Sequence, residues 1–285
     1  MKISIVTAVW NRVETIRSAL ESVARQKTDG FELEHILVDG GSTDGTAEVI
    51  RLYAEDVRRA EAERREGDSA GKFTVRWVSE KDRGLYDAIN KGIRLATGDV
   101  IGLVHSDDVL AEDDTLAKIA QAFRAEVDAT YADVRFVVGG RTLDEIRQQP
   151  TRRYCTGRFF RRWMFRFATF PAHPSTFVRR ACFEKYGLYS LDYPICADFE
   201  LMLRLFVTHR IRTRYLPICT HVMRMGGLST GGFRSNVAIN RQDLRALRAN
   251  GVWSCLPLIY LKYLFKVWGF IFRRQILCAL SSRAA

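Results

Sequence analysis

The sequence predicts an α/β protein built on a doubly wound, mainly parallel sheet, with a helical addition at the C-terminus. Apolar strand-like runs alternate with segments of helical periodicity through the first 110 residues, which is the pattern of βαβ units. The composition, 47% hydrophobic and 27% charged over 285 residues, fits one large domain with additions or two small domains. Acidic residues follow several strand-like runs, at the edge where open α/β sheets bind ligands.

The first half contains four expected strands, separated by expected helices. The strands are predicted over residues 3–9, 33–38, 73–78 and 100–104. Helices are predicted over residues 13–24, 46–53, 85–96 and 111–124. Asn11 and Glu14 have the spacing of a capping box for the first helix, and Thr43 or Asp44 can cap the second. The charged stretch 55–71 indicates a solvated helix extension or loop.

The second half is less regular. Gly139-Gly140 indicates a hairpin turn between strands over 131–138 and 141–143. Two further strands are expected over 175–178 and 215–219, and two helices over 197–206 and 237–248. Residues 252–272 are rich in Trp, Leu, Tyr and Phe.

The charge and the cysteines limit the class of protein. A formal net charge of +11 suits nucleic acid, an anionic membrane face or a phosphate-bearing substrate, and does not by itself choose among them. The six cysteines are scattered without a C-x-x-C pair, so neither a disulfide framework nor a structural zinc site is indicated. The first seven residues are strand-like rather than a signal peptide, which makes a cytoplasmic protein the expectation.

Adjacent carboxylates mark the end of the fourth expected strand, in the stretch His105-Ser106-Asp107-Asp108. Two adjacent carboxylates repel each other, and each raises the pKa of the other unless a cation or hydrogen-bond donors stabilise the charged forms. Hard cations such as Mg²⁺ are held by one or two carboxylates together with substrate phosphates. The alternative is an exposed pair that caps the next helix.

Three more acidic sites lie at strand ends or helix starts. Asp39 closes a strand before Gly40-Gly41, which lets a ligand approach the backbone closely, although an Asp-Gly turn is also common. The pattern is not G-x-G-x-x-G, which disfavours a nicotinamide-type dinucleotide site. Asp82 can cap the third helix. Asp198 begins a helix whose dipole favours the ionised carboxylate, as a general base requires, or is simply an N-cap.

Seven pieces of sequence, taken together and in this order, resemble family 2 glycosyltransferases, the inverting enzymes with a GT-A fold. The most similar subset is the bacterial enzymes that build cell-surface polysaccharides and glycolipids. The resemblance runs from about residue 2 to about residue 229 and is strongest over the first 110 residues. The pieces are Thr7-Ala8-Val9-Trp10-Asn11, residues 38–46 and 80–92, Ser106-Asp107-Asp108, His173-Pro174-Ser175-Thr176, Asp198-Phe199-Glu200 and Gly226-Gly227-Leu228-Ser229.

The resemblance implies roles for individual residues. Thr7 and Asn11 would border the nucleotide pocket. Asp39 would bind the base, typically uracil N3, with Asp82 near the same nucleoside. Asp198 would be the general base. It also implies a division into a GT-A domain over 1–230, with a nucleotide-binding half (1–110) and an acceptor half (111–230), and a C-terminal helical, membrane-associated segment over 231–285.

The metal site is implied with one departure from the family pattern. Asp107 and Asp108 would stand for the Asp-x-Asp motif and contact the ribose and a divalent ion, Mg²⁺ or Mn²⁺, on the diphosphate. Family members often read Asp-x-Asp-Asp here, whereas this chain has His105 at the first position. A histidine late in the chain can complete the metal shell in GT-A enzymes. His221 is the candidate, ahead of His173.

Two stretches combine basic and aromatic residues. Residues 152–167 suit stacking on nucleic-acid bases, contact with an anionic membrane, or a basic surface over a buried aromatic edge. Their place between the metal site and the base favours an acceptor or membrane role. Residues 252–272 are long enough to span a bilayer, but Pro257, Lys262 and Lys266 disfavour a spanning helix. We expect an in-plane amphipathic helix at the inner leaflet, with a helix packed on the catalytic domain as the alternative.

The resulting hypothesis is a metal-dependent inverting glycosyltransferase, peripheral at the cytoplasmic face of the cell membrane. It would move a sugar from a nucleotide-sugar, by resemblance a UDP-sugar, to a hydroxyl of a glycan or lipid-linked acceptor, and would not bind nucleic acid. A nucleotidyltransferase is the first alternative, but residues 7–12 lack the Gly/Arg/Lys-rich phosphate loop it needs. A non-catalytic basic protein that binds membrane or nucleic acid is the second, and it leaves the four acidic sites unexplained.

Overall fold

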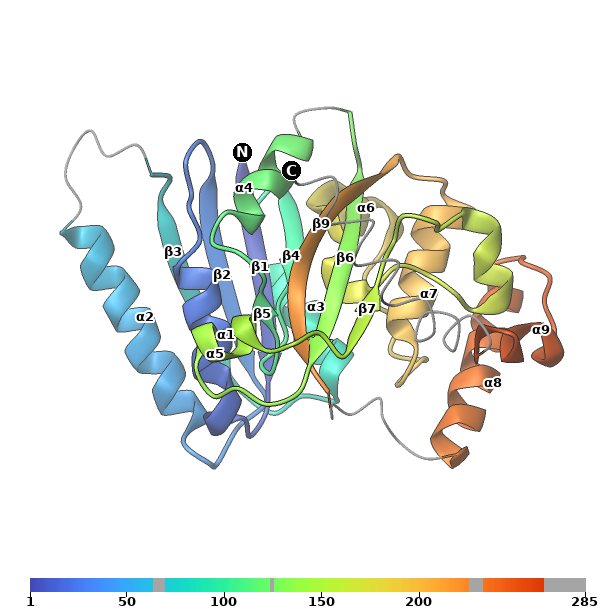
Figure 1. Ribbon diagram of the computed structural model, residues 1–285, viewed down its shortest axis with the longest axis horizontal. Helices are drawn as coiled ribbons and strands as arrows, with labels where there is room; N and C mark the ends of the chain where they lie inside the picture. Colours follow the sequence, from blue (N-terminus) through green and yellow to red (C-terminus); the bar gives the residue numbers. More distant parts are fainter. Residues whose placement is uncertain (64–69, 124–125, 226–232, 264–285) are drawn as a thin grey trace.

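A computed structural model describes residues 1–63, 70–123, 126–225 and 233–263 of the chain. Figure 1 shows a twisted sheet with helices on both sides and a helical group at one end. The motif over 226–229 and the sequence after residue 263 lie outside the described residues, as does most of the predicted loop after Glu63.

The first half is the predicted parallel α/β unit. Its elements are β1 (Lys2–Val9), α1 (Val13–Ala24), β2 (Glu32–Asp39), α2 (Thr46–Ala62), β3 (Phe73–Ser79), α3 (Leu85–Leu95) and β4 (Val100–Leu103). The four strands are parallel and lie in the order β3-β2-β1-β4. The chain therefore winds outward from β1 and returns to β4, which creates the topological switch point where open sheets bind ligands.

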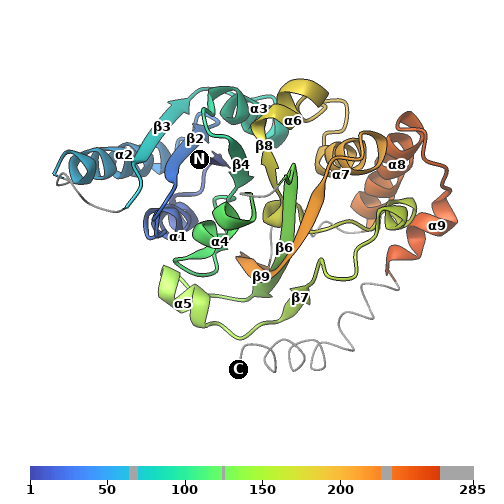
Figure 2. The ribbon, with the colours of Figure 1, turned by 90° about the horizontal axis from the view of Figure 1, so that it is seen from above.

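Alternating side chains of these strands build two core layers. Val6, Ala8, Ile36 and Val38 face the layer that contains α3, while Ile3, Ile5, Leu33 and Leu37 face α1, α2 and α4. Strand side chains point to opposite faces at successive positions, and both faces are covered, which is why the strands read as continuous apolar runs. Figure 2 shows α3 and α6 on one side of the sheet and α1, α4 and α5 on the other.

The second half extends the same sheet instead of forming its own. Its strands are β5 (Val109–Leu110), β6 (Ala129–Val137), β7 (Arg153–Cys155), β8 (Phe177–Arg179) and β9 (Thr213–Arg224). β8 pairs antiparallel with both β4 and β6, β6 pairs parallel with β9, and β9 pairs antiparallel with β5. The sheet is thus mixed, and all-parallel only in its first four strands.

Helices fill the connections of the second half and gather at one end. They are α4 (Thr115–Ala122), α5 (Leu143–Gln148), α6 (Arg180–Tyr186), α7 (Ala197–Leu203), α8 (Phe233–Ala249) and α9 (Leu256–Tyr260). Short turns of other helix types are η1 (Arg162–Phe167), η2 (His173–Ser175) and η3 (Arg204–Thr208). Among the helices that the structure describes, none is long and apolar enough to cross a membrane.

A predicted hairpin and a predicted capping box were wrong. The hairpin at Gly139-Gly140 does not form, because α5 follows it and β6 pairs instead with the later strand β7. Thr142 caps α5 by accepting the backbone N–H of Glu145, a signal that the sequence carries. The capping box at Asn11 is also absent: Asn11 adopts a left-handed φ of 50°, and Asp44 accepts the Val13 N–H at the start of α1.

Candidate active site

The carboxyl ends of the four parallel strands bring the predicted acidic residues to one edge. Val9 of β1 is paired with Asp39 of β2, and Asp39 with Ser79 of β3, so these strands end level with one another. Asp107 and Asp108 follow β4 at the same edge. The loops that carry Asn11, Asp39, Asp82 and the Asp107-Asp108 pair therefore share one end of the sheet, as the sequence predicted.

Asp39 is fully buried at the tip of β2. Its carboxylate accepts hydrogen bonds from the backbone N–H and hydroxyl of Ser42 and from the hydroxyl of Ser79, at 2.6 Å for Ser79. Asn11 fixes the same loop from β1, because its side-chain oxygen accepts the Thr43 N–H at 2.9 Å. The glycine-rich loop after β2 is therefore held in one shape from two neighbouring strands.

Asp82 does not cap α3, whose N-cap position is Gly84. Its side chain is only 7% exposed and lies 2.5 Å from the Lys91 ammonium of α3. A Cβ added to Gly40 would lie 3.2 Å from Asp82 Oδ2 and 3.5 Å from Trp10, so the backbone of this loop passes close to both side chains. The indole of Trp10 is 64% exposed beside them, which leaves an aromatic face open at this edge.

Thr7, which was predicted to border the nucleotide pocket, points into the interior. It is fully buried, and its hydroxyl donates to the Val104 carbonyl at 2.7 Å. Because that hydroxyl is used as a donor, it accepts from Nε2 of His35 at 3.0 Å, and Nδ1 of His35 then accepts from Tyr53. Burial lowers the pKa of His35 to about 3, which keeps the ring neutral. Thr7 thus joins β1 to β4 beneath the site.

The Asp107-Asp108 pair is asymmetric. Asp107 is partly exposed, whereas Asp108 is buried, and burial followed by the charge of Asp107 raises the pKa of Asp108 well above its usual range. The charge of Arg224, at the end of β9, opposes that shift. The guanidinium of Arg224 contacts Ser18 of α1, and its Nε is buried without a hydrogen-bond partner. A carboxylate pair and a partly desolvated cation therefore lie together.

His221 is not available as a metal ligand in this structure. Its Nε2 donates to the Leu103 carbonyl at 3.0 Å, and its Nδ1 lies 3.0 Å from the hydroxyl of Thr220. Both ring nitrogens are used, and burial lowers its pKa to about 3. His173 is also engaged, because its Nε2 lies 2.6 Å from the Tyr189 hydroxyl. Across the described part of the chain, no group of three or more His, Cys, Asp or Glu is placed to hold a metal ion.

Asp198 lies in the first turn of α7, as predicted, but its environment differs from that of an ordinary N-cap. Burial raises the pKa of Asp198 to about 6, opposed by the Phe199 N–H at 2.8 Å and by the Tyr86 hydroxyl at 3.0 Å. The expectation that the helix start alone keeps this carboxylate readily ionised is therefore too simple. A carboxylate with a pKa near 6 is ionised at neutral pH and still basic enough to accept a proton.

Helix α3 connects this carboxylate to the donor side. The ring of Tyr86 stacks on Tyr189 at 5.5 Å between centroids, and the backbone N–H and C=O of Tyr189 both hydrogen-bond the side chain of Asn90. The Tyr189 hydroxyl contacts His173, whose ring lies 6.3 Å from that of His105 in the loop of the acidic pair. An unbroken series of contacts therefore joins Asp198 to the end of β4.

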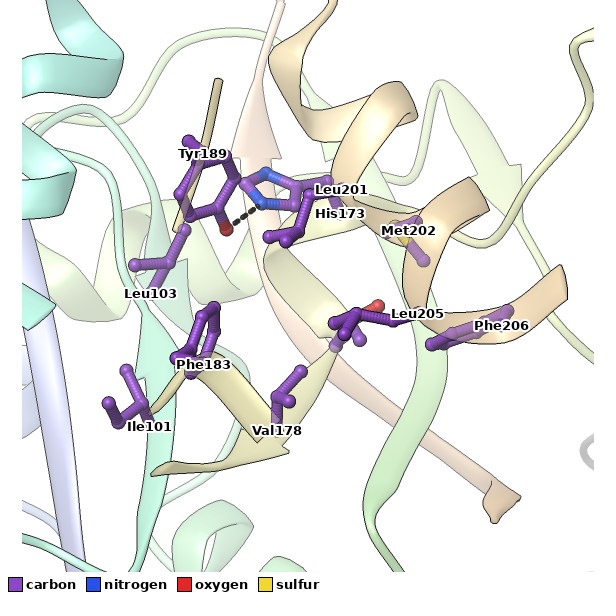
Figure 3. A pocket seen from close by; sticks show the side chains of 11 residues that line it. Ile101, Leu103, His173, Val178, Phe183, Tyr189, Leu201, Met202, Leu205 and Phe206 are labelled. Carbon is purple, nitrogen blue, oxygen red and sulfur yellow. Dashed lines mark hydrogen bonds between the residues drawn. The ribbon is translucent and has the colours of Figure 1, made fainter. Parts of the chain in front are cut away.

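An enclosed cavity of about 10 Å³ lies beneath this series of contacts. Figure 3 shows His173 and Tyr189 at one end, joined by their hydrogen bond, and the apolar side chains of Val178, Leu205 and Phe206 at the other. Its size is that of about one water molecule. The cavity is therefore a packing gap under the site and not the place for a substrate.

Three residues of the site were not assigned a role from the sequence. Trp10 and Tyr86 lie inside quoted motifs, and a signal existed for Trp10, because a large aromatic directly after an apolar strand is seldom needed for packing. Tyr86 reads as an ordinary apolar position of α3. Arg224 gave no signal, because only the pairing of β9 with β5 places it near the acidic pair.

Proteins of related sequence cover most of the chain. The family described as "Glycosyl transferase family 2" matches residues 4–187. A "PGL/p-HBAD biosynthesis glycosyltransferase" of Mycobacterium bovis is 32% identical over 252 residues, which are 86% of this chain and 83% of that protein. An uncharacterized glycosyltransferase of Mycobacterium tuberculosis is 29% identical over 208 residues, covering 71% of this chain and 68% of that protein.

Solved structures share the fold. TarS of S. aureus, residues 1-349 in complex with UDP, has a TM-score of 0.53 at 17% identity; the match covers 87% of this chain but only 65% of that chain. The mannosyltransferase PcManGT of Pyrobaculum calidifontis, in complex with GDP-Man and Mn2+, has a TM-score of 0.58 at 18% identity and covers 98% of this chain and 75% of that chain. At such low identity these likenesses establish the architecture alone.

Proposed function

The chain belongs to glycosyl transferase family 2, and from this premise we propose that it moves a sugar from a UDP-sugar to a hydroxyl of a glycan or lipid-linked acceptor, with inversion at the anomeric carbon. The observation that carries the proposal is Asp198, a carboxylate with a pKa of about 6, connected through α3 to an acidic strand edge. A purely binding protein gives such a carboxylate no task, and a nucleotidyltransferase needs a phosphate loop that residues 7–12 do not supply.

The donor nucleotide is proposed to lie over the ends of β1, β2 and β3. The open face of Trp10 suits stacking on a nucleobase. Asp39 takes a base N–H in addition to its three donors from Ser42 and Ser79, since an ionised carboxylate offers about four lone-pair sites. Asn11 and Asp82 hold the surrounding loops in place. Support for UDP comes from the S. aureus relative TarS, which was solved with UDP.

The acidic pair is suited to a divalent ion that arrives with the donor. Asp107 and Asp108 repel each other in a partly buried setting, an arrangement that Mg²⁺ or Mn²⁺ would relieve. The lack of a larger ligand cluster in the described ranges agrees with an ion held by one or two carboxylates plus substrate phosphates. Such an ion, when bound, would neutralise charge on the departing nucleoside diphosphate. Arg224 adds a positive charge of the chain's own beside the pair.

Asp198 is proposed to accept the proton of the acceptor hydroxyl. As the hydroxyl oxygen bonds to the anomeric carbon, the bond from that carbon to the diphosphate oxygen breaks, and the nucleoside diphosphate leaves with that electron pair. One displacement inverts the configuration and needs no covalent nucleophile. The related mycobacterial enzymes of PGL/p-HBAD biosynthesis favour a glycolipid acceptor, which would place this protein peripherally at the inner face of the membrane.

Two measurements test the proposal. Calorimetric titration with UDP, GDP and dTDP, each with and without Mn²⁺, should show micromolar binding of UDP that a chelator weakens. Asp198→Asn should abolish transfer while UDP affinity is kept, because the carboxylate lies on the acceptor side. Retention of transfer by that variant would contradict the assignment of the base. Absence of nucleotide binding by a folded protein would contradict the donor site.

A further inference from the structure

The positive charge of the chain is concentrated in two segments. Residues 146–183 contain nine arginines and no acidic residue, and residues 244–285 contain seven basic residues and no acidic one. Together these segments carry more positive charge than the whole chain's net +11, so the remainder is net acidic. The positive charge is therefore concentrated in two parts of the sequence and is not spread evenly along the chain.

The fold brings parts of the two segments together. The Ser254 hydroxyl donates to the backbone carbonyl of Arg166 at 2.6 Å, which ties the start of the C-terminal region to η1. Ile259 of α9 is fully buried, and Lys262 pairs with Asp243 of α8 at 2.8 Å in the interior. The described part of the predicted C-terminal helix thus packs on the rest of the protein next to η1. Figure 2 shows α8 and α9 side by side, with α7 beside α8.

Large aromatic side chains are exposed where these segments meet. Phe159 is 66% exposed, Trp163 is 59% exposed, and Trp253 is 69% exposed. Their neighbours Phe160 and Phe165 are buried, so this part of the chain is anchored and the outward rings are not misplaced core residues. We call this region the basic aromatic surface; it consists of the exposed residues Arg158, Phe159, Arg161, Arg162, Trp163, Arg166, Trp253, Leu256, Tyr260 and Leu261.

We propose that the basic aromatic surface docks the enzyme onto an anionic phospholipid bilayer. Tryptophan, tyrosine and phenylalanine rings favour the membrane–water interface, and arginines are attracted to anionic headgroups. Aliphatic side chains distinguish this surface from one for nucleic acid, because Leu256 and Leu261 have no stacking role on bases but gain from burial among acyl chains. The sequence beyond residue 263 continues with aromatic and basic residues and no acidic one.

The position of the surface relative to Asp198 gives the docking a purpose, and this step alone depends on the proposed function. The inward rings Phe165 and Phe170 contact Phe199 at 5.6 and 5.3 Å between centroids. Phe199 directly follows Asp198 in α7. The basic aromatic surface is therefore separated from the helix that carries the base by one layer of packed side chains. Docking through this surface would hold Asp198 close to the bilayer in which a lipid-linked acceptor is anchored.

Sedimentation of the full chain with vesicles tests the surface without donor or acceptor. Binding is measured on phosphatidylcholine alone and on an equimolar mixture with phosphatidylglycerol. We expect partition onto the mixed vesicles that falls as salt is raised. Two double variants, Phe159→Ser with Trp163→Ser and Arg158→Glu with Arg161→Glu, should each weaken it about tenfold or more. The matched control is Leu52→Ser with Arg58→Glu on the exposed face of α2, which should bind as the unchanged chain does.

Several outcomes would overturn the proposal. They are failure of the unchanged chain to sediment with mixed vesicles, equal loss in the α2 control, and tighter binding to single-stranded RNA than to vesicles at the same salt. UDP titration of the same variants separates this result from the proposed function. A variant that loses vesicle binding but still binds UDP supports the docking surface and leaves the proposed function untouched. If the unchanged chain does not bind UDP, the proposed function is contradicted and not the docking surface.

Discussion

Replacing Tyr86 by Phe removes one hydroxyl, whose single proton lies within reach of two acceptors, Asp198 Oδ1 and the Ile195 carbonyl, each at 3.0 Å. That hydroxyl lies 3.0 Å from Asp198 Oδ1 and stabilises the ionised carboxylate, opposing the burial that raises its pKa to about 6. The ring is buried and stacked on Tyr189, so the Phe ring should keep its place. A hydrogen bond to a charged group contributes about 1.5–3 kcal/mol, which at 1.36 kcal/mol per unit corresponds to about one to two pKa units.

Tyr86→Phe should slow transfer at neutral pH, because it raises the pKa of Asp198. Loss of a donor to the charged form raises the pKa of Asp198 further, so more of the enzyme carries a protonated base at neutral pH. The ionised fraction at pH 7 then falls from about nine tenths to between a half and a tenth, and transfer slows about two- to tenfold. At pH 9 both enzymes hold an ionised carboxylate and should have similar rates.

The assay is the pH profile of kcat/KM for transfer from the donor identified by titration. Its acidic limb should fall below about pH 6 in the unchanged enzyme and shift upward in Tyr86→Phe. Tyr189→Phe is the matched control, because the hydroxyl of this stacked neighbour contacts His173 and not Asp198. Equal losses at pH 7 and pH 9 with an unmoved limb would refute the reasoning, and so would a shift of the same size in the control.

Three further perturbations test other parts of the structure. Gly92→Ala would place a Cβ 2.3 Å from Val6 Cγ1. The resulting overpacking should outweigh the gain in helix propensity and lower the free energy of unfolding by about 1–2 kcal/mol. An unchanged midpoint of urea unfolding would contradict this close packing. Arg224→Gln removes a cation beside Asp107 and Asp108 and should weaken UDP binding about tenfold, whereas Arg224→Lys should recover part of the affinity. Calorimetry measures the UDP affinity of both variants. Unaltered affinity in Arg224→Gln would exclude a role of Arg224 in holding the diphosphate. Asp108→Asn should reduce the Mn²⁺-dependent part of UDP binding and leave the chelator-resistant part intact; equal loss of both parts would show that the residue serves the fold and not the ion.

The elements that the sequence predicted correctly are those whose signal is local. The strands β1 to β4 read as apolar runs because both of their faces are covered, and α3 has an apolar face with the required 3.6-residue period. The wrong hairpin at Gly139-Gly140 came from giving two glycines more weight than the cap of α5, in which Thr142 accepts the Glu145 N–H. The sequence contains both the two glycines and the capping threonine, and nothing in the local pattern shows which of the two decides the structure.

The positions of side chains along the chain could be predicted from the sequence, but their directions could not. That acidic residues gather at one edge follows from the topology, because parallel strands end together. The direction in which a side chain points is a property of the packed sheet, and it turned Thr7 inward to Val104 and His221 inward to Leu103. The sequence around Thr7 and His221 contains no feature that distinguishes an inward-facing side chain from one that faces a ligand.

The sequence by itself therefore determined the α/β class, the four parallel strands and the edge at which acidic groups collect, because these depend on periodicity and chain order. Only the tertiary structure decided how the second half joins the sheet, which places Arg224 beside the acidic pair. It also decided the pKa of Asp198, whose partner Tyr86 lies 112 residues away. Burial and hydrogen bonding across such separations arise from packing, and no local window of the chain contains them.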